Sequence, residues 1–289
     1  MTAPLPAQLE HLFTHQTADV NGVLLHYVIG GQGFPVVLLH GWPQTWYAWR
    51  KIMPALGSRY TVIAPDLRGL GDSAKMETGY DAPTLAEDIF SLVRSLGFQQ
   101  IFLVSHDLGV SVAYAYAAQH REDVRRLVIL DIPIEGFGRE ELAQKRNIWH
   151  FGFFQVPGLA ESLVEGRERL LLQWFFSHVR NPAALTQEDI DEYVRCYSAP
   201  DALRAGFEYY RAFAYNAQQF KEYSKHKLRV PVLALGGENS GGAFPFSSLA
   251  QLAEHVCGGI IPQCGHYIPE EQPEELVRRL SAFFSQHEP

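Results

Sequence analysis

The chain has 289 residues, 47% of them hydrophobic, and a formal net charge of −8 at pH 7. This is enough apolar material for one large domain with a full core. No run of Lys or Arg points to a nucleic acid or an anionic membrane as a partner. We therefore expect an uncharged, apolar small molecule as the partner.

The cysteines and the apolar stretches bear on location. Cys196, Cys257 and Cys264 are odd in number and lack metal-ligand spacing, which predicts free thiols in a reducing compartment and no bound metal. The first 15 residues hold no apolar stretch typical of a signal peptide, and no segment reaches the roughly 18 apolar residues of a membrane span. We expect a cytoplasmic protein. Two alternatives stay open: a leader that has been removed, and a homodimer.

Apolar runs alternate with helical patterns in the first part of the chain, as in a parallel sheet wrapped by helices. The strands predicted here are 23–29, 35–40, 60–65, a run ending at Val104, and 126–131. Between them, a helical face that begins at Leu85 is opened by the capping pair Thr84 and Glu87 and closed by Gly97.

The alternation lapses between residues 133 and 225, where the chain is aromatic, Glu-rich and helical in period. Strands return at 229–236 and 258–262, followed by a helix at 273–284. We predict an α/β fold with a mostly parallel sheet flanked by helices, built from a two-part core, 1–132 and 226–289. Residues 133–225 are predicted to form a helical lid over the carboxyl edge of the sheet.

The most specific motif is the turn after Val104. In the run 105–109, Ser-His-Asp-Leu-Gly, small residues stand two positions before and after Asp107, as a sharp strand-to-helix turn requires. Such a nucleophile elbow exposes its tip to substrate, so Asp107 is the predicted nucleophile. Two alternatives stay open: Ser105 as the nucleophile, although its flanking positions are not small, and Asp107 as a helix cap.

Two further motifs would complete a site at Asp107. The run 40–43, His-Gly-Trp-Pro, follows a predicted strand directly, so the backbone N–H groups of Trp42 and Leu108 would form an oxyanion hole for an ester of Asp107. His266 lies in a late loop that suits a base in the chain order nucleophile, acid, histidine. The acid that orients His266 is either Asp131, at the end of one predicted strand, or Glu238, after the next.

With Asp107 at the elbow, the 40–43 motif, the run 66–73 (Asp-Leu-Arg-Gly-Leu-Gly-Asp-Ser) and the late Gly265-His266, the chain resembles the α/β-hydrolase fold over nearly its whole length. It is most similar to the branch that holds epoxide hydrolases, haloalkane dehalogenases and haloacetate dehalogenases. The resemblance implies that Asp107 attacks carbon to form an alkyl ester, which water activated by His266 then hydrolyses.

Within that branch, the residues that meet the leaving group favour an epoxide hydrolase. Leu108 stands where haloalkane dehalogenases commonly have a halide-binding Trp, and Leu108 and Ser111 stand where haloacetate dehalogenases have arginines. An opening epoxide needs proton donors from the lid. His150 and Tyr210 resemble the donor pair of the Cif-type epoxide hydrolases. The chain differs from that subgroup at Asp131, where the subgroup usually has a glutamate.

We therefore expect a cofactor-free epoxide hydrolase that opens an apolar epoxide to a vicinal diol. The expected catalytic residues are Asp107, His266, Asp131, His150 and Tyr210, and the expected lining residues of the substrate pocket are His40, Trp149 and Phe151. The alternative is a haloacetate or haloalkane dehalogenase, in which Trp149 and His150 would receive the halide. A catalytically silent scaffold is the third reading, since fold does not settle function.

Overall fold

Within residues 4–286, eight strands form one sheet in the order β1-β2-β4-β3-β5-β6-β7-β8. Strands β3 to β8 run parallel, and β2 and β1 extend the sheet antiparallel at one edge. The computed structural model describes residues 4–286, so residues 1–3 and 287–289 of the predicted core lie outside the described residues. The strands are β1 Phe13–Val20, β2 Val23–Gly30, β3 Phe34–Leu39, β4 Tyr60–Pro65, β5 Ile101–His106, β6 Val124–Leu130, β7 Val232–Gly237 and β8 Val256–Ile261. The predicted α/β fold with a mostly parallel sheet is confirmed.

Two local predictions differ from the structure. Strand β1 was not predicted, because it carries no apolar run. It lies at the sheet edge and buries Phe13 and Val20 at its ends, while most residues between them are exposed. Helix α2, Ala82–Ser95, begins before the predicted Thr84, since Asp81 is its N-cap and accepts a hydrogen bond from the Thr84 backbone N–H at 3.0 Å.

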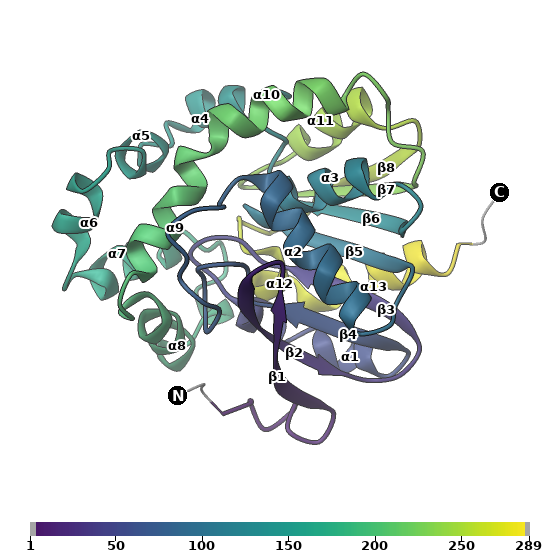
Figure 1. Cartoon of the computed structure of the whole chain (residues 1–289), viewed down its shortest axis with the longest axis horizontal. Helices are drawn as coiled ribbons and strands as arrows, with labels where there is room; N and C mark the ends of the chain where they lie inside the picture. Colours follow the sequence, from purple (N-terminus) through teal and green to yellow (C-terminus); the bar gives the residue numbers. More distant parts are fainter. Residues whose placement is uncertain (1–3, 287–289) are drawn as a thin grey trace.

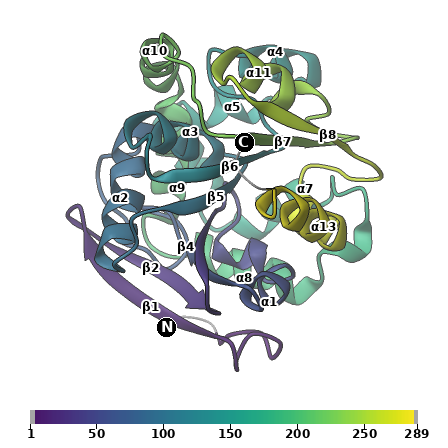
Figure 2. The same cartoon turned by 90° about the vertical axis from the view of Figure 1, so that its right-hand side faces the viewer.

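Helices cover both faces of the sheet, and the buried apolar residues accordingly divide into two clusters. Helices α2, α3 (Gly109–Gln119) and α11 (Phe244–Leu252) pack on one face. Helices α1 (Met53–Gly57) and α13 (Pro273–Phe284) pack on the other, and Figure 2 shows α2 and α13 on opposite sides. Two short elements, η1 (Trp46–Trp49) and α12 (Ile268–Glu271), lie in loops of the core.

Between β6 and β7 the described chain forms helices and no strand. These are α4 Arg139–Arg146, α5 His150–Phe154, α6 Leu159–Val164, α7 Glu168–Phe176, η2 Pro182–Ala184, α8 Gln187–Tyr197, α9 Ala202–Arg211 and α10 Phe213–Tyr223. We call residues 139–223 the helical insertion. In Figure 1, α5 to α9 lie to the left of the sheet, and none of the helices in residues 4–286 has the length and apolarity to cross a membrane.

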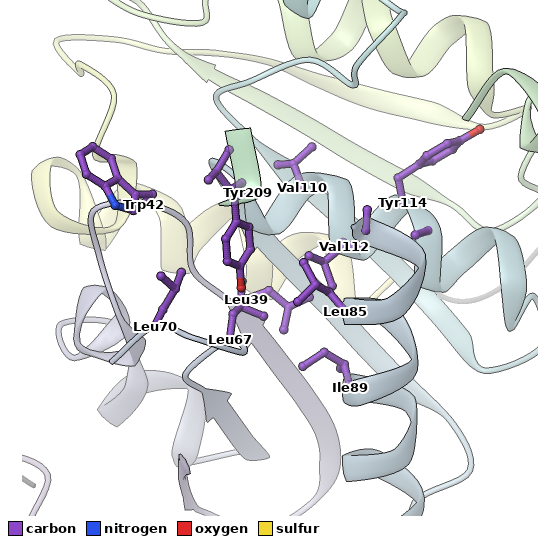
Figure 3. Packing of buried hydrophobic residues seen from close by; sticks show 14 of the residues in the cluster. Leu39, Trp42, Leu67, Leu70, Leu85, Ile89, Val110, Val112, Tyr114 and Tyr209 are labelled. Carbon is purple, nitrogen blue, oxygen red and sulfur yellow. The ribbon is translucent and has the colours of Figure 1, made fainter. Parts of the chain in front are cut away.

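Helix α9 ties the helical insertion to the core. Figure 3 shows the side chain of Tyr209 among Leu39, Leu67 and Leu85, which belong to the cluster on the α2 side of the sheet. The buried Tyr209 hydroxyl donates a hydrogen bond to the Arg68 carbonyl oxygen at 2.7 Å. This anchor sets the position of the next residue along the helix, Tyr210.

Candidate active site

Asp107 stands at the tip of a sharp turn between β5 and α3, with a φ of +50° that a non-glycine residue rarely adopts. Glycines make room for this turn. A Cβ on Gly109 would lie 2.5 Å from the His40 carbonyl oxygen, and one on Gly41 would lie 2.3 Å from Asp107 Oδ1. Ser105, the alternative nucleophile, is fully buried and donates its hydroxyl to the Val128 carbonyl oxygen at 3.0 Å. Of the two, Asp107 faces the cavity described below.

The Asp107 carboxylate is held from two sides. The backbone N–H of Trp42 donates to Oδ1 at 2.8 Å, and the backbone N–H of Leu108 also donates to the carboxylate. On the other side, His266 Nε2 lies 3.4 Å from Oδ2. Burial alone would raise the pKa of Asp107, but the hydrogen bond and charge of His266 outweigh it and lower the pKa to about 2. The carboxylate is therefore ionised at neutral pH, with Oδ1 fixed and Oδ2 facing the histidine.

The other ring nitrogen of His266 binds a buried acid. Nδ1 donates to Asp131 Oδ2 at 2.6 Å, and Asp131 follows the last residue of β6. Asp131 also accepts from the N–H groups of Gly237 and Gly241, at 2.9 and 3.1 Å, and from the Ser240 hydroxyl at 2.7 Å. Burial raises the pKa of Asp131, yet these bonds and His266 bring it below its usual value.

Glu238, the alternative acid, points away from His266. Its side chain is exposed and accepts a hydrogen bond from the Gln263 backbone N–H at 2.9 Å. The structure thus brings Asp131, and not Glu238, into contact with His266.

His266 lies between two carboxylates, which sets its charge. Burial would lower its pKa, but the bonds to Asp107 and Asp131 prevail and raise the pKa to about 10. At neutral pH the imidazole is therefore protonated while Asp107 is ionised. Neutralising Asp107 would remove one of the two charges that hold this proton.

Two polar side chains of the helical insertion face Asp107. His150 begins α5 and Tyr210 lies in α9, with ring centroids 5.8 Å apart. Burial lowers the pKa of His150 to about 4, so its ring is neutral at neutral pH and has one N–H to donate. Burial and the charge of Asp107 raise the pKa of Tyr210 well above 10, so the hydroxyl keeps its proton.

These groups line one cavity of about 230 Å³. The lining residues are Trp42, Asp107, Ile132, Leu142, Arg146, Ile148, His150, Phe151, Trp174, Phe175, His178, Tyr210, Asn239, Ser240, His266 and Tyr267. Six of the lining residues are Trp, Phe or Tyr, and these rings offer apolar surface to a small molecule beside the polar groups at Asp107. The structure places Phe151 in this lining.

The structure does not place His40 and Trp149, the other two expected lining residues, in this cavity. His40 is fully buried beneath the elbow, where Nδ1 donates to the Gly41 carbonyl oxygen at 2.9 Å and Nε2 accepts from the Leu67 N–H at 3.1 Å. It shapes the turn that carries Trp42. Trp149 is 44% exposed and lines a separate groove on the outside of the helical insertion.

Two residues that sequence reasoning missed hold the His266 loop. His106 Nε2 donates to the His266 carbonyl oxygen at 2.7 Å, and burial lowers the pKa of His106 to about 4. The buried Glu271 accepts hydrogen bonds from the N–H groups of Gly265 and Tyr267, both at 3.1 Å. It also accepts from the Arg180 N–H at 2.6 Å, which ties the loop to the helical insertion. Both lie beside the motifs in sequence, but only the fold reveals their partners.

Among residues 4–286, one group of three side chains could hold a metal ion: His26, Asp66 and Asp72. It lies apart from the cavity, and each member is already bonded within the protein. His26 Nδ1 pairs with Asp66 Oδ2 at 2.7 Å, and Asp72 pairs with Arg195 at 2.9 Å. These contacts within the protein explain why the three side chains lie close together.

The fold and the elbow agree with comparison to known proteins. A family model described as the alpha/beta hydrolase fold matches residues 35–273. The chain belongs to the α/β-hydrolase fold family.

Individual proteins of this family that are similar to the chain include epoxide hydrolases. The chain is 40% identical over 279 residues to the soluble epoxide hydrolase of Corynebacterium sp. (strain C12), covering 94% of this chain and 97% of that protein. Among solved structures, Cfl2 from Burkholderia cenocepacia is 38% identical with a TM-score of 0.89, covering 94% of this chain and 96% of that one. The Cif epoxide hydrolase from Acinetobacter nosocomialis is 28% identical with a TM-score of 0.87, covering 94% and 88%. The predicted resemblance to the epoxide hydrolase branch of the α/β-hydrolase fold is confirmed.

Proposed function

We propose that the protein is an epoxide hydrolase that converts an apolar epoxide and water into a vicinal diol. One observation carries the proposal: an ionised Asp107 faces a small aromatic cavity across from two neutral proton donors, His150 and Tyr210. The 40% identity to a soluble epoxide hydrolase supports it.

In the first step, Asp107 opens the ring. Oδ1 is held by the N–H group of Trp42, so Oδ2 attacks an epoxide carbon and the C–O bond of the ring breaks. An alkoxide is a poor leaving group, so the ring oxygen needs a hydrogen-bond donor and then a proton. Tyr210 and His150 are the hydrogen-bond donors on that side of the cavity; the ring oxygen takes a proton from Tyr210, which regains one from solvent. The product is an alkyl ester of Asp107.

In the second step, His266 activates water. Ester formation neutralises Asp107, which removes one carboxylate charge from beside His266 and so lowers the pKa of the imidazole from about 10. The imidazole releases its proton to solvent, and the neutral ring then takes a proton from water as that water attacks the ester carbonyl carbon of Asp107. The N–H groups of Trp42 and Leu108 stabilise the oxyanion. The C–O bond to the alkyl oxygen then breaks, that oxygen takes the proton from His266 to complete the diol, and Asp107 is released as the carboxylate.

The proposal includes the division into core and lid. Asp107, Asp131 and His266 come from the ranges 1–132 and 226–289, whereas His150 and Tyr210 come from 133–225. The range 133–225 acts as the lid that supplies the ring-opening donors. We also place the protein in the cytoplasm, which the three free cysteines support.

The dehalogenase alternative receives no specific support from the site. The positions that would carry arginines in a haloacetate dehalogenase are Leu108 and Ser111, and Ser111 donates its hydroxyl to the buried Glu135 at 2.7 Å. Neither position offers a cation to an anionic substrate.

Tyr210→Phe is expected to slow alkylation of Asp107, because the variant keeps the ring in place and loses the hydroxyl that donates to the epoxide oxygen. The expected loss is roughly 10²-fold or more, the lower range for acid catalysis. Stopped-flow measurement of single turnovers separates this step from ester hydrolysis, which should stay within about twofold of wild type. Equal alkylation rates in Tyr210→Phe and wild type would remove Tyr210 from the mechanism.

The two steps are expected to differ in pH dependence. Alkylation needs ionised Asp107, whose pKa of about 2 predicts a flat rate from about pH 5 to about pH 9. Ester hydrolysis needs neutral His266, so its rate should rise with pH until the pH passes the lowered pKa of His266 in the ester. Single-turnover rates across this pH range test both slopes, and an ester hydrolysis rate that falls with rising pH would contradict the assignment of His266.

A further inference from the structure

The outside of the helical insertion carries an apolar groove of about 420 Å³. We call it the outer groove; its lining residues are Trp149, Leu163, Val164, Arg167, Leu170, Leu171 and Trp174. They come from α6, α7, the link between these helices and the residue before α5; α6 and α7 lie at the left edge of Figure 1. Leu170 is 67% exposed and Leu163 53%, so large apolar side chains face solvent here. A concentration of this kind on a protein surface marks a binding site more often than chance exposure.

The outer groove adjoins the cavity above Asp107. Trp174 lines both, and its ring lies 4.9 Å from that of Phe175, a cavity residue. Trp149 packs against Trp174 at 5.2 Å between ring centroids and against His150 at 5.9 Å. One layer of indole rings therefore separates the ring-opening donor His150 from the groove, and a chain that leaves the cavity over Trp174 enters the groove.

Size and chemistry indicate the occupant. A cavity of about 230 Å³ is below the roughly 300–1,000 Å³ of most ligand pockets, and the groove adds the missing space. Six of its seven lining residues are apolar. The seventh, Arg167, donates to the Leu163 carbonyl oxygen at 3.3 Å. The occupant is therefore an apolar chain that is continuous with the group in the cavity.

We infer that the outer groove is a subsite for the hydrocarbon tail of the substrate, so that the preferred substrates are long-chain, uncharged alkyl epoxides. The epoxide ring lies at Asp107 and the tail crosses Trp174 to contact Leu163 and Leu170. This inference rests on the proposed function and adds the substrate class to it. Each methylene that the groove buries should raise kcat/KM by up to about fourfold, the factor expected for full burial.

The test is the chain-length dependence of kcat/KM for 1,2-epoxyalkanes from epoxybutane to epoxydodecane. The rate of diol formation is measured at concentrations below the solubility limit of each substrate. In wild type, kcat/KM should rise about two- to fourfold per methylene once the tail exceeds the cavity. Leu170→Asp should flatten this rise, because its carboxylate disfavours an apolar tail, while epoxybutane turnover stays within twofold. Leu170 is exposed enough for the variant to fold.

Leu159→Asp is the matched control, since Leu159 is 51% exposed on α6 and does not line the groove. It should keep the wild-type slope. Epoxybutane turnover with no chain-length dependence, or with the same slope in Leu170→Asp, overturns the subsite alone. A dimer in wild type that Leu170→Asp converts to monomer with the slope retained would make the groove an interface and also overturn it. Absence of diol from every epoxide removes the proposed function, and the subsite with it.

Discussion

Incubation of a His266→Gln variant with an epoxide is expected to add the mass of one substrate molecule to the protein, on Asp107. Alkylation needs only the ionised carboxylate and the donors His150 and Tyr210, so it still proceeds. Hydrolysis of the ester loses its base and should slow by about 10⁴-fold or more. Intact-protein mass spectrometry detects the adduct, and peptide mapping locates it.

The control is the double variant His266→Gln with Asp107→Asn, which should gain no mass because an amide is a poor nucleophile. An adduct that persists in the double variant would place the nucleophile elsewhere. Loss of activity in Ser105→Ala, with no adduct on Asp107, would make Ser105 the nucleophile in place of Asp107. We do not expect this result, because the Ser105 hydroxyl donates to a backbone carbonyl oxygen.

Asp131→Asn is expected to slow ester hydrolysis by roughly 10²- to 10⁴-fold, as acids that orient a catalytic histidine do. The amide disturbs the 2.6 Å bond that holds His266 Nδ1 and removes a charge that raises the pKa of the imidazole. The ester of Asp107 should therefore accumulate during turnover, which rapid quench and mass spectrometry detect.

Glu238→Gln is the matched control for Asp131→Asn, because it makes the same chemical change at the other candidate acid. It should keep turnover within about twofold of wild type, since Glu238 is exposed and bonded to Gln263. Ser240→Ala should also have a small effect, as Asp131 retains two backbone donors. The assignment fails if Glu238→Gln loses activity and Asp131→Asn does not.

Local sequence patterns were enough to predict the elbow and the parallel strands. Asp107 and Gly109 are close in the chain, and the turn they form needs small neighbours whatever the rest of the fold does. Strands β3 to β6 are mostly buried and mostly apolar, which is typical of a parallel sheet covered on both faces. Strand order placed both Asp131 and Glu238 at the carboxyl edge near His266, so the sequence left two candidate acids, of which the structure brings Asp131 into contact.

Where side chains lie differently from the expectation, or were not expected in the site, their contacts are ones that local sequence patterns do not reveal. His40 precedes Trp42 in the motif, yet its side chain turns inward because the Leu67 N–H and the Gly41 carbonyl bind its ring. Trp149 neighbours His150, but adjacent residues at the start of a helix point in different directions, and Trp149 faces outward. Glu271 reaches Arg180, 91 residues away, a pairing for which the sequence carries no periodic signal.

The central claim is that Asp107 forms a covalent ester with an epoxide, and a single turnover in ¹⁸O-labelled water tests it most directly. With enzyme in excess over substrate, the diol should contain no ¹⁸O, because one oxygen comes from the epoxide and the other from the Asp107 carboxylate. The label should instead appear in the peptide that contains Asp107. A diol labelled in the first turnover, with an unlabelled Asp107, would show that water attacks the epoxide directly and would contradict the account.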